Sequence, residues 1–201
     1  MRAPIDVPGD ATVIAADVGL AEANRLGVRV DLLVGDMDSV GRADLEAFEA
    51  AGGEIRHHPE DKDATDLDLA IGEALGADVQ RVVVVGGAGG RLDHLLGNAL
   101  VLASSRFAAL EVDAVFGAAR LHVVRGRREL AGVRGELVSL FALGGPARGV
   151  RTEGLRWALD EDTLDPGSSL GISNRFLGHR ALVEVHAGVV LVVRPGDQDT
   201  R

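Results

Sequence analysis

Acidic residues follow a short apolar run near the start of the chain. Residues 35–39 read GDMDS and directly follow residues 32–34, which have the composition of a buried strand. In an extended chain alternate side chains point to one side, so Asp36 and Asp38 would lie together. Mg²⁺ prefers one or two carboxylates together with substrate phosphates, so the pair indicates a Mg²⁺ site. The alternative is a solvated loop in which Ser39 caps the next helix.

A second acidic segment, KDATDLD at residues 62–68, has the composition of a helix start. Thr65 followed by Asp68 fits a capping box, which leaves Lys62 and Asp66 without a role in the cap. A helix N-terminus with a lysine nearby suits a phosphate, and Asp66 could be a third metal ligand or a base. The alternative is a helix cap and nothing more.

A glycine-rich segment, GGAGGRLDH at residues 86–94, links an expected strand to an expected helix. Glycines let backbone N–H groups approach an anion closely, and Arg91 offers a fork of donors that suits phosphate. The alternative for Asp93 and His94 is to cap the helix or to pair with Arg91. Asp17 is a further carboxylate directly after an expected strand.

The elements that must position these residues alternate along the first part of the chain. Strands are expected at residues 13–16, 32–34, 54–57 and 81–85, and helices at 21–26, 43–51, 67–75 and 92–103. This alternation predicts an α/β domain with a mostly parallel, Rossmann-like sheet. All four features would then follow strands of one sheet, where open α/β sheets bind ligands.

From about residue 111 the pattern changes to short strands and turns, with no long helix. Strands are expected at residues 112–116, 121–124, 137–143, 181–186 and 189–193, the last two joined by a tight hairpin at Ala187 and Gly188. This half has the pattern of an all-β sandwich or barrel. We predict two domains, residues 1–125 and 126–201.

The composition excludes several classes of function. The formal net charge of −10 argues against a nucleic-acid partner and against an anionic membrane surface. Without cysteine, the chain has no disulfides and no thiolate chemistry. We see no signal peptide and no apolar run long enough to span a membrane, so we expect a cytoplasmic protein.

Taken together, the motifs resemble those of thiamine pyrophosphokinases. The resemblance runs from about residue 13 to 193. It rests on the segments at 35–39, 62–67 and 89–94, and on LGGP at 143–146, GLRW at 154–157 and GISN at 171–174. The family transfers a diphosphate unit from ATP to the hydroxyl group of thiamine and releases AMP.

The resemblance also implies roles for single residues. Asp36, Asp38 and Asp66 would hold Mg²⁺, with Asp66 as the expected base. The nucleotide would contact Asp17, Lys62, Thr65, Gly90, Arg91 and Asp93. Thiamine would contact Ser173 and Asn174, and would stack on Trp157 or Phe176. The family is dimeric, so these last residues would serve a thiamine site between subunits.

Two other functions fit the same residues. A metal-dependent nucleotide phosphohydrolase would use the carboxylates to activate water instead of thiamine. A degenerate module that binds nucleotide or thiamine without turnover would fit the short segment before Asp17, where the family has a further strand. The segment at 171–174 favours the kinase over the hydrolase, and intact Asp36, Asp38 and Asp66 favour catalysis over binding alone.

Overall fold

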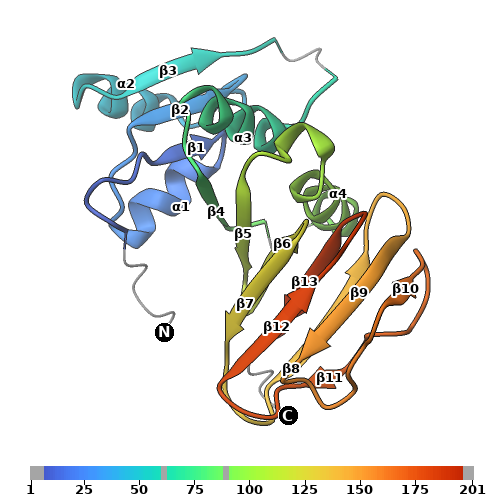
Figure 1. Ribbon diagram of the computed structural model, residues 1–201. Helices are drawn as coiled ribbons and strands as arrows, with labels where there is room; N and C mark the ends of the chain where they lie inside the picture. Colours follow the sequence, from blue (N-terminus) through green and yellow to red (C-terminus); the bar gives the residue numbers. More distant parts are fainter. Residues whose placement is uncertain (1–6, 60–62, 88–90, 197–201) are drawn as a thin grey trace. The chain divides into compact units, whose positions relative to one another are not determined.

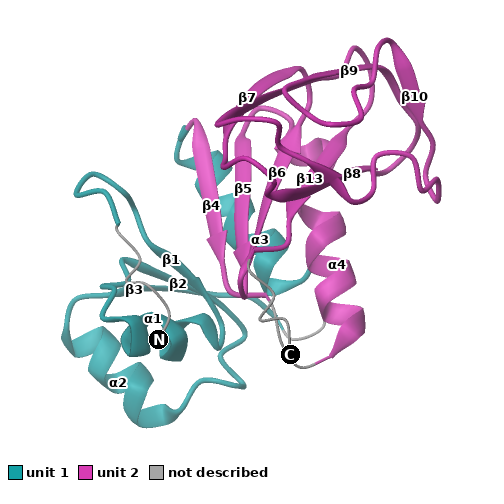
Figure 2. Ribbon diagram, turned by 90° about the horizontal axis from the view of Figure 1, so that it is seen from below, with its two compact units in different colours: residues 1–79 teal, residues 80–201 magenta. Residues whose placement is uncertain are grey.

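The computed structural model describes residues 7–59, 63–87 and 91–196. By packing, the chain divides into two units, Met1–Val79 and Gln80–Arg201 (Figure 2). This division by packing lies before the domain boundary predicted at residues 125/126, which remains a prediction. Each unit is described by itself below.

The first unit alternates strands and helices. Its elements are β1 (Ile14–Ala16), α1 (Gly19–Leu26), β2 (Leu32–Gly35), α2 (Arg42–Ala50), β3 (Glu54–His57) and α3 (Asp66–Gly76). The strands pair in the order β1-β2-β3, and both pairings are parallel (Figure 1). The helices and strands expected here are confirmed to within two residues at each end.

Strand β2 is the centre of this unit and is buried along its whole length. Leu33 packs in a cluster with Leu20 of α1 and Phe48 of α2. Helix α3 packs against β1 and β2 as well. A parallel strand covered on both faces has an unbroken apolar sequence, which is what residues 32–34 show.

The second unit opens with β4 (Arg81–Val85), α4 (Leu92–Leu102) and a 3₁₀ turn, Ser105–Phe107. Strands make up the rest. They are β5 (Glu111–Phe116), β6 (Ala119–Val124), β7 (Arg127–Ala131), β8 (Leu137–Ala142), β9 (Ala147–Glu153), β10 (Asp162–Leu164), β11 (Asn174–Arg175), β12 (Arg180–Glu184) and β13 (Val190–Arg194). Beyond Phe107 the described part of the chain contains no further helix, as predicted.

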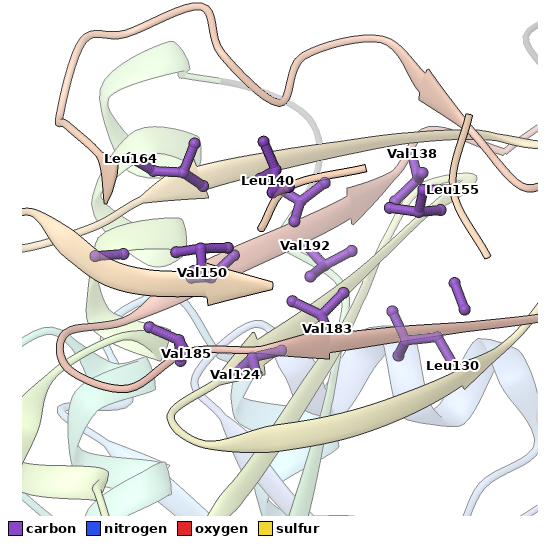
Figure 3. Close-up of a cluster of buried hydrophobic side chains, with 14 of the residues drawn as sticks. Val124, Leu130, Val138, Leu140, Val150, Leu155, Leu164, Val183, Val185 and Val192 are labelled. Atoms are coloured by element: carbon purple, nitrogen blue, oxygen red, sulfur yellow. The ribbon is translucent and has the colours of Figure 1, made fainter. Parts of the chain in front are cut away.

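Two sheets form this unit. One has the order β10-β9-β12-β7, and the other has the order β11-β8-β13-β6-β5-β4. The core between them is built from alternate residues of facing strands, among them Leu140, Val150, Val183 and Val192 (Figure 3). Burying each such side chain contributes about 1.5–3 kcal/mol, so this aliphatic cluster holds the sandwich together.

The structure corrects two expectations about strand pairing. Strand β4 pairs with β5 in the second unit, so the glycine-rich segment after β4 does not follow a strand of the β1-β2-β3 sheet. Strands β12 and β13 lie in different sheets, so Ala187 and Gly188 connect the two sheets and do not form a hairpin. The tight turn was predicted from local composition, which does not specify a strand's partner.

Candidate active site

Parallel pairing of β1 with β2 brings carboxylates to one end of the sheet. Ala16 pairs with Val34, and the Asp17 amide donates to the Val34 carbonyl at 3.0 Å. Asp17, Asp36 and Asp38 each offer a carboxylate oxygen, and these oxygens all lie within 4.8 Å of one another. We call these residues the aspartate cluster. Its oxygens are the type of ligand that Mg²⁺ prefers.

A left-handed turn, and not an extended strand, brings Asp36 and Asp38 together. Met37 between them has a φ of 65°, and its side chain is buried in the core of the first unit. The Asp38 amide donates to Asp36 Oδ1 at 3.2 Å. The expectation of an extended segment was therefore wrong, although the two carboxylates meet as expected.

Gly35 lets the chain leave β2 in this direction. Its φ is 150°, and a Cβ at this position would lie 3.4 Å from both Asp17 Cβ and Asp66 Oδ1. A side chain at residue 35 would therefore be strained and would crowd the carboxylates. The glycine keeps space free next to the aspartate cluster.

The carboxyl group of Asp17 lies in an unfavourable electrostatic environment. Burial raises the pKa of its carboxyl group, and the charges of Asp66 and Asp36 raise it further, while a hydrogen bond from the Val18 amide acts in the opposite direction. Asp17 Oδ1 is buried and has no hydrogen-bond partner among the described residues. A buried carboxylate oxygen without a partner, facing other carboxylates, fits a cation site.

Asp66 lies beside this cluster but outside it. It is the first residue of α3, and Thr65 is the N-cap, with Thr65 Oγ1 accepting from the Asp68 amide at 3.2 Å. The predicted metal set of Asp36, Asp38 and Asp66 therefore differs from the set of oxygens that the structure brings together. Asp17, and not Asp66, is the third residue of this set. The charge of Asp66 raises the pKa of Asp17. Asp17 directly follows the strand that pairs with β2. This sequence position could have predicted that Asp17 belongs to the set.

Ser39 was considered only as a helix cap, and that interpretation was wrong. The N-cap of α2 is Gly41, and Ser39 Oγ donates to Asp38 Oδ1 at 2.8 Å. Ser39 and Asp17 also line a small pocket of about 110 Å³ together with Val40 and Asp44. The hydroxyl group thus orients one carboxylate of the cluster.

The remaining predicted nucleotide contacts fall elsewhere. Lys62 and Gly90 lie outside the described residues. Arg91 and Asp93 belong to the second unit, where Arg91 Nε and Nη2 donate to the two oxygens of Asp93 at 3.1 and 2.6 Å. The hydrogen bond from Arg91 lowers the pKa of Asp93 to about 2. Asp93 and Arg91 therefore form an exposed, bidentate ion pair at the start of α4.

The predicted thiamine contacts lie together in the second unit. Trp157 is 53% exposed and Phe176 is 1% exposed. Because Phe176 is a core residue, Trp157 is the aromatic side chain of the two that a ligand can reach. Ser173 is exposed at a φ of 59°, and its amide donates to Ser139 Oγ at 3.0 Å. Asn174 is buried, and its amide group binds the main chain of Trp157.

Comparison with known proteins identifies the family. Residues 8–113 match the family described as "Thiamin pyrophosphokinase, catalytic domain", and residues 121–190 match "Thiamin pyrophosphokinase, vitamin B1 binding domain". The chain belongs to the thiamine pyrophosphokinase family. The resemblance drawn from the motifs is thereby confirmed. The aspartate cluster falls within the first match, and Trp157 and Asn174 fall within the second.

Relatives in this family differ in length. Thiamine pyrophosphokinase 1 of Oryza sativa subsp. japonica is 30% identical over 160 residues, which cover 75% of this chain and 60% of the relative. Thiamine pyrophosphokinase of Bacillus subtilis (strain 168) is 24% identical over 186 residues, covering 92% of this chain and 87% of the relative. The chain thus spans less than two thirds of the rice relative's length and most of the bacterial one's.

Solved structures of the family share the fold. The crystal structure of thiamine pyrophosphokinase from Bacillus subtilis matches with a TM-score of 0.84 at 21% identity, covering 96% of this chain and 91% of that one. Thiamin pyrophosphokinase from Candida albicans matches with a TM-score of 0.72 at 14% identity, covering 90% and 81%. None of the helices in the described ranges combines the length and the hydrophobicity that a membrane span requires.

Proposed function

We propose that the chain is a thiamine pyrophosphokinase, which transfers a diphosphate unit from ATP to the hydroxyl group of thiamine and releases AMP. The observation that carries this proposal is the aspartate cluster at the carboxyl ends of two parallel strands, in a chain of this family. Ligands of open α/β sheets bind at such strand ends.

The aspartate cluster would hold Mg²⁺. When bound, the ion neutralises negative charge on the phosphates of ATP. The partnerless Oδ1 of Asp17 supports the assignment, because a cation supplies the interaction that the protein does not. Ser39 keeps Asp38 oriented toward the same space through its hydrogen bond.

In the proposed reaction, the hydroxyl oxygen of thiamine attacks the β-phosphorus of ATP. The bond from that phosphorus to the oxygen that bridges it to the α-phosphate breaks, and AMP leaves. The hydroxyl proton passes to a base, for which we propose Asp66, because its carboxyl group lies next to the aspartate cluster. Positioning and charge stabilisation would supply most of the rate gain.

The two parts of the chain would divide this work. Residues 1–125 would form a Rossmann-like domain that binds nucleotide and metal, and residues 126–201 would bind thiamine and form a homodimer. Nucleotide contacts would come from Lys62, Thr65, Gly90, Arg91 and Asp93. The cytoplasmic location remains a prediction.

Thiamine would stack on Trp157. The exposed indole ring suits a flat cationic ring, because the face of an aromatic ring attracts positive charge. Ser173, exposed in the same segment as Asn174, would offer its hydroxyl group as a hydrogen-bond partner for the pyrimidine.

The test is product analysis after incubation with ATP, Mg²⁺ and thiamine. We expect AMP and thiamine diphosphate in equal amounts, and neither product from the Asp36→Asn variant. Asparagine at residue 36 keeps the Oδ1 acceptor for the Asp38 amide, so this variant should fold normally. ATP consumed without thiamine would indicate a hydrolase, and no consumption would indicate a binding module; either result refutes the kinase.

A further inference from the structure

Asn174 is a buried polar residue whose side chain binds main-chain atoms of two other residues. Its side chain is 2% exposed and lies on β11. Its Oδ1 accepts from the Trp157 amide at 3.1 Å and from the Arg175 amide at 2.8 Å, and its Nδ2 donates to the Trp157 carbonyl at 2.7 Å. One side chain therefore binds both polar main-chain atoms of Trp157.

Main-chain hydrogen bonds to the segment around Asn174 also hold the segment that carries Trp157. Gly154 accepts from the Leu177 amide at 2.8 Å, and the Arg156 amide donates to the Arg175 carbonyl at 2.9 Å. The Arg156 guanidinium lies 4.9 Å from the centre of the Trp157 ring. The backbone of residue 157 is thus fixed although its ring is about half exposed.

An exposed aromatic ring on a fixed backbone loses less conformational freedom when a ligand stacks on it than a ring on a mobile loop does. We propose that Asn174 is a positioning residue, which holds the main chain of Trp157 so that the indole ring is presented to thiamine. The inference rests on the proposed function. It replaces the expected role of Asn174 as a direct thiamine contact, since its oxygen is saturated by two amides and its side chain is buried.

The Asn174→Asp variant tests this role with little change in shape. The aspartate carboxylate keeps one oxygen as the acceptor for the two amides. Its second oxygen replaces Nδ2, so an acceptor and not a donor faces the Trp157 carbonyl. Because Trp157 is the only tryptophan in the chain, its fluorescence reports on this residue alone. We expect lower fluorescence anisotropy without ligand, a KM for thiamine raised about tenfold, and a KM for ATP within about twofold of wild type.

Asp113→Asn is the matched control, because it makes the opposite exchange of amide and carboxylate at another buried position of the same unit. It should lower stability and leave both the anisotropy and the KM for thiamine unchanged. If Asn174→Asp raised the KM for thiamine with unchanged anisotropy, Asn174 would contact thiamine directly and the inference would be wrong. An unchanged KM for thiamine would overturn it as well.

A measurement on the wild-type chain keeps the test independent of how the variant folds. Hydrogen exchange at the Trp157 amide should be as slow as in neighbouring strands, because Asn174 binds it. Exchange at the rate of an open loop would refute the interaction. Failure of the proposed function would look different: thiamine would then change neither the Trp157 fluorescence nor the rate of AMP release, while the ligand-free anisotropy would still differ between wild type and variant.

Discussion

The carboxyl group of Asp17 opposes the stability of the metal-free fold. Its carboxyl group is partly buried, faces other carboxylates and leaves one oxygen without a partner among the described residues. The folded state therefore binds a proton at Asp17 more readily than the unfolded chain does. At neutral pH without metal the ionised group costs stability, and a bound cation would reverse the sign of its contribution.

We predict that Asp17→Asn raises the melting temperature of the metal-free protein and removes most of the stabilisation by Mg²⁺. Asparagine has nearly the same shape but neither the repulsion nor the affinity for a cation. Thermal unfolding with and without Mg²⁺ measures both effects. Asp78→Asn, an exposed residue of the same unit, removes the same charge and should leave the Mg²⁺ response intact. An undiminished Mg²⁺ response in Asp17→Asn would exclude it from the metal site.

At the scale of elements, the start of α3 both caps the helix and places Asp66. The Thr65 hydroxyl accepts the Asp68 amide, and Asp66 follows as the first helical residue. We predict that Thr65→Ala costs about 1 kcal/mol of unfolding free energy, since an amide loses its cap. Urea denaturation measures this loss. Thr65→Ser keeps the hydroxyl and should recover most of it; equal losses in the two variants would mean that the cap contributes little.

In the second unit, the buried carboxyl group of Asp113 links strands of the two sheets. Asp113 on β5 lies 2.7 Å from Arg81 of β4, from His122 of β6 and from Arg128 of β7. Burial of Asp113 acts to raise its pKa, but the hydrogen bonds from His122 and Arg81 and the charge of Arg128 outweigh it, and the pKa falls to about 2. The ionised carboxylate therefore stabilises the fold.

We predict that Asp113→Asn lowers the unfolding free energy at neutral pH by about 2 kcal/mol. Because the folded pKa is depressed, the stabilisation is complete above the unfolded value of 3.8 and disappears as the pH falls through about 2. Denaturation of wild type and variant across this range should therefore show the two converging. Glu111→Gln, which removes a half-exposed partner of the same arginines, should change stability little. A constant difference at all pH values would contradict the assignment.

At the scale of the whole molecule, the homodimer that we propose would bring the thiamine residues of one subunit to the nucleotide site of another. This predicts complementation between two inactive variants. Asp36→Asn lacks a cluster residue, and Trp157→Ala lacks the aromatic ring. Mixed after unfolding and refolding together, they should recover about a quarter of wild-type activity, because half of random dimers are mixed and each has one intact site. No recovery, with dimers shown by sedimentation, would mean that each chain builds its own thiamine site.

The sequence by itself determined the local structure of the first unit and the residue types of the candidate site. The spacing of apolar residues and the composition predict the ends of β1 to β3 and α1 to α3 to within two residues. They do so because burial of one or both faces of an element sets which of its residues are apolar. The motifs also indicated the aspartates after β2 and the cap at Thr65. In the second unit, β7 and β9 were missed, since each carries arginines among its few apolar residues and shows little alternation. The strands β10 and β11 were missed as well, since two or three residues are too few to show a pattern.

The tertiary structure decided which of these segments meet. Asp17 joins Asp36 and Asp38 because β1 pairs with β2 and because Met37 adopts a left-handed conformation. Asn174 binds Trp157 across a separation of 17 residues, and Phe176 two residues later turns into the core. The sequence of a strand determines which of its faces is buried. Which strand it pairs with depends on the free energy of packing the whole core. Contacts between distant segments were therefore beyond what local patterns could predict.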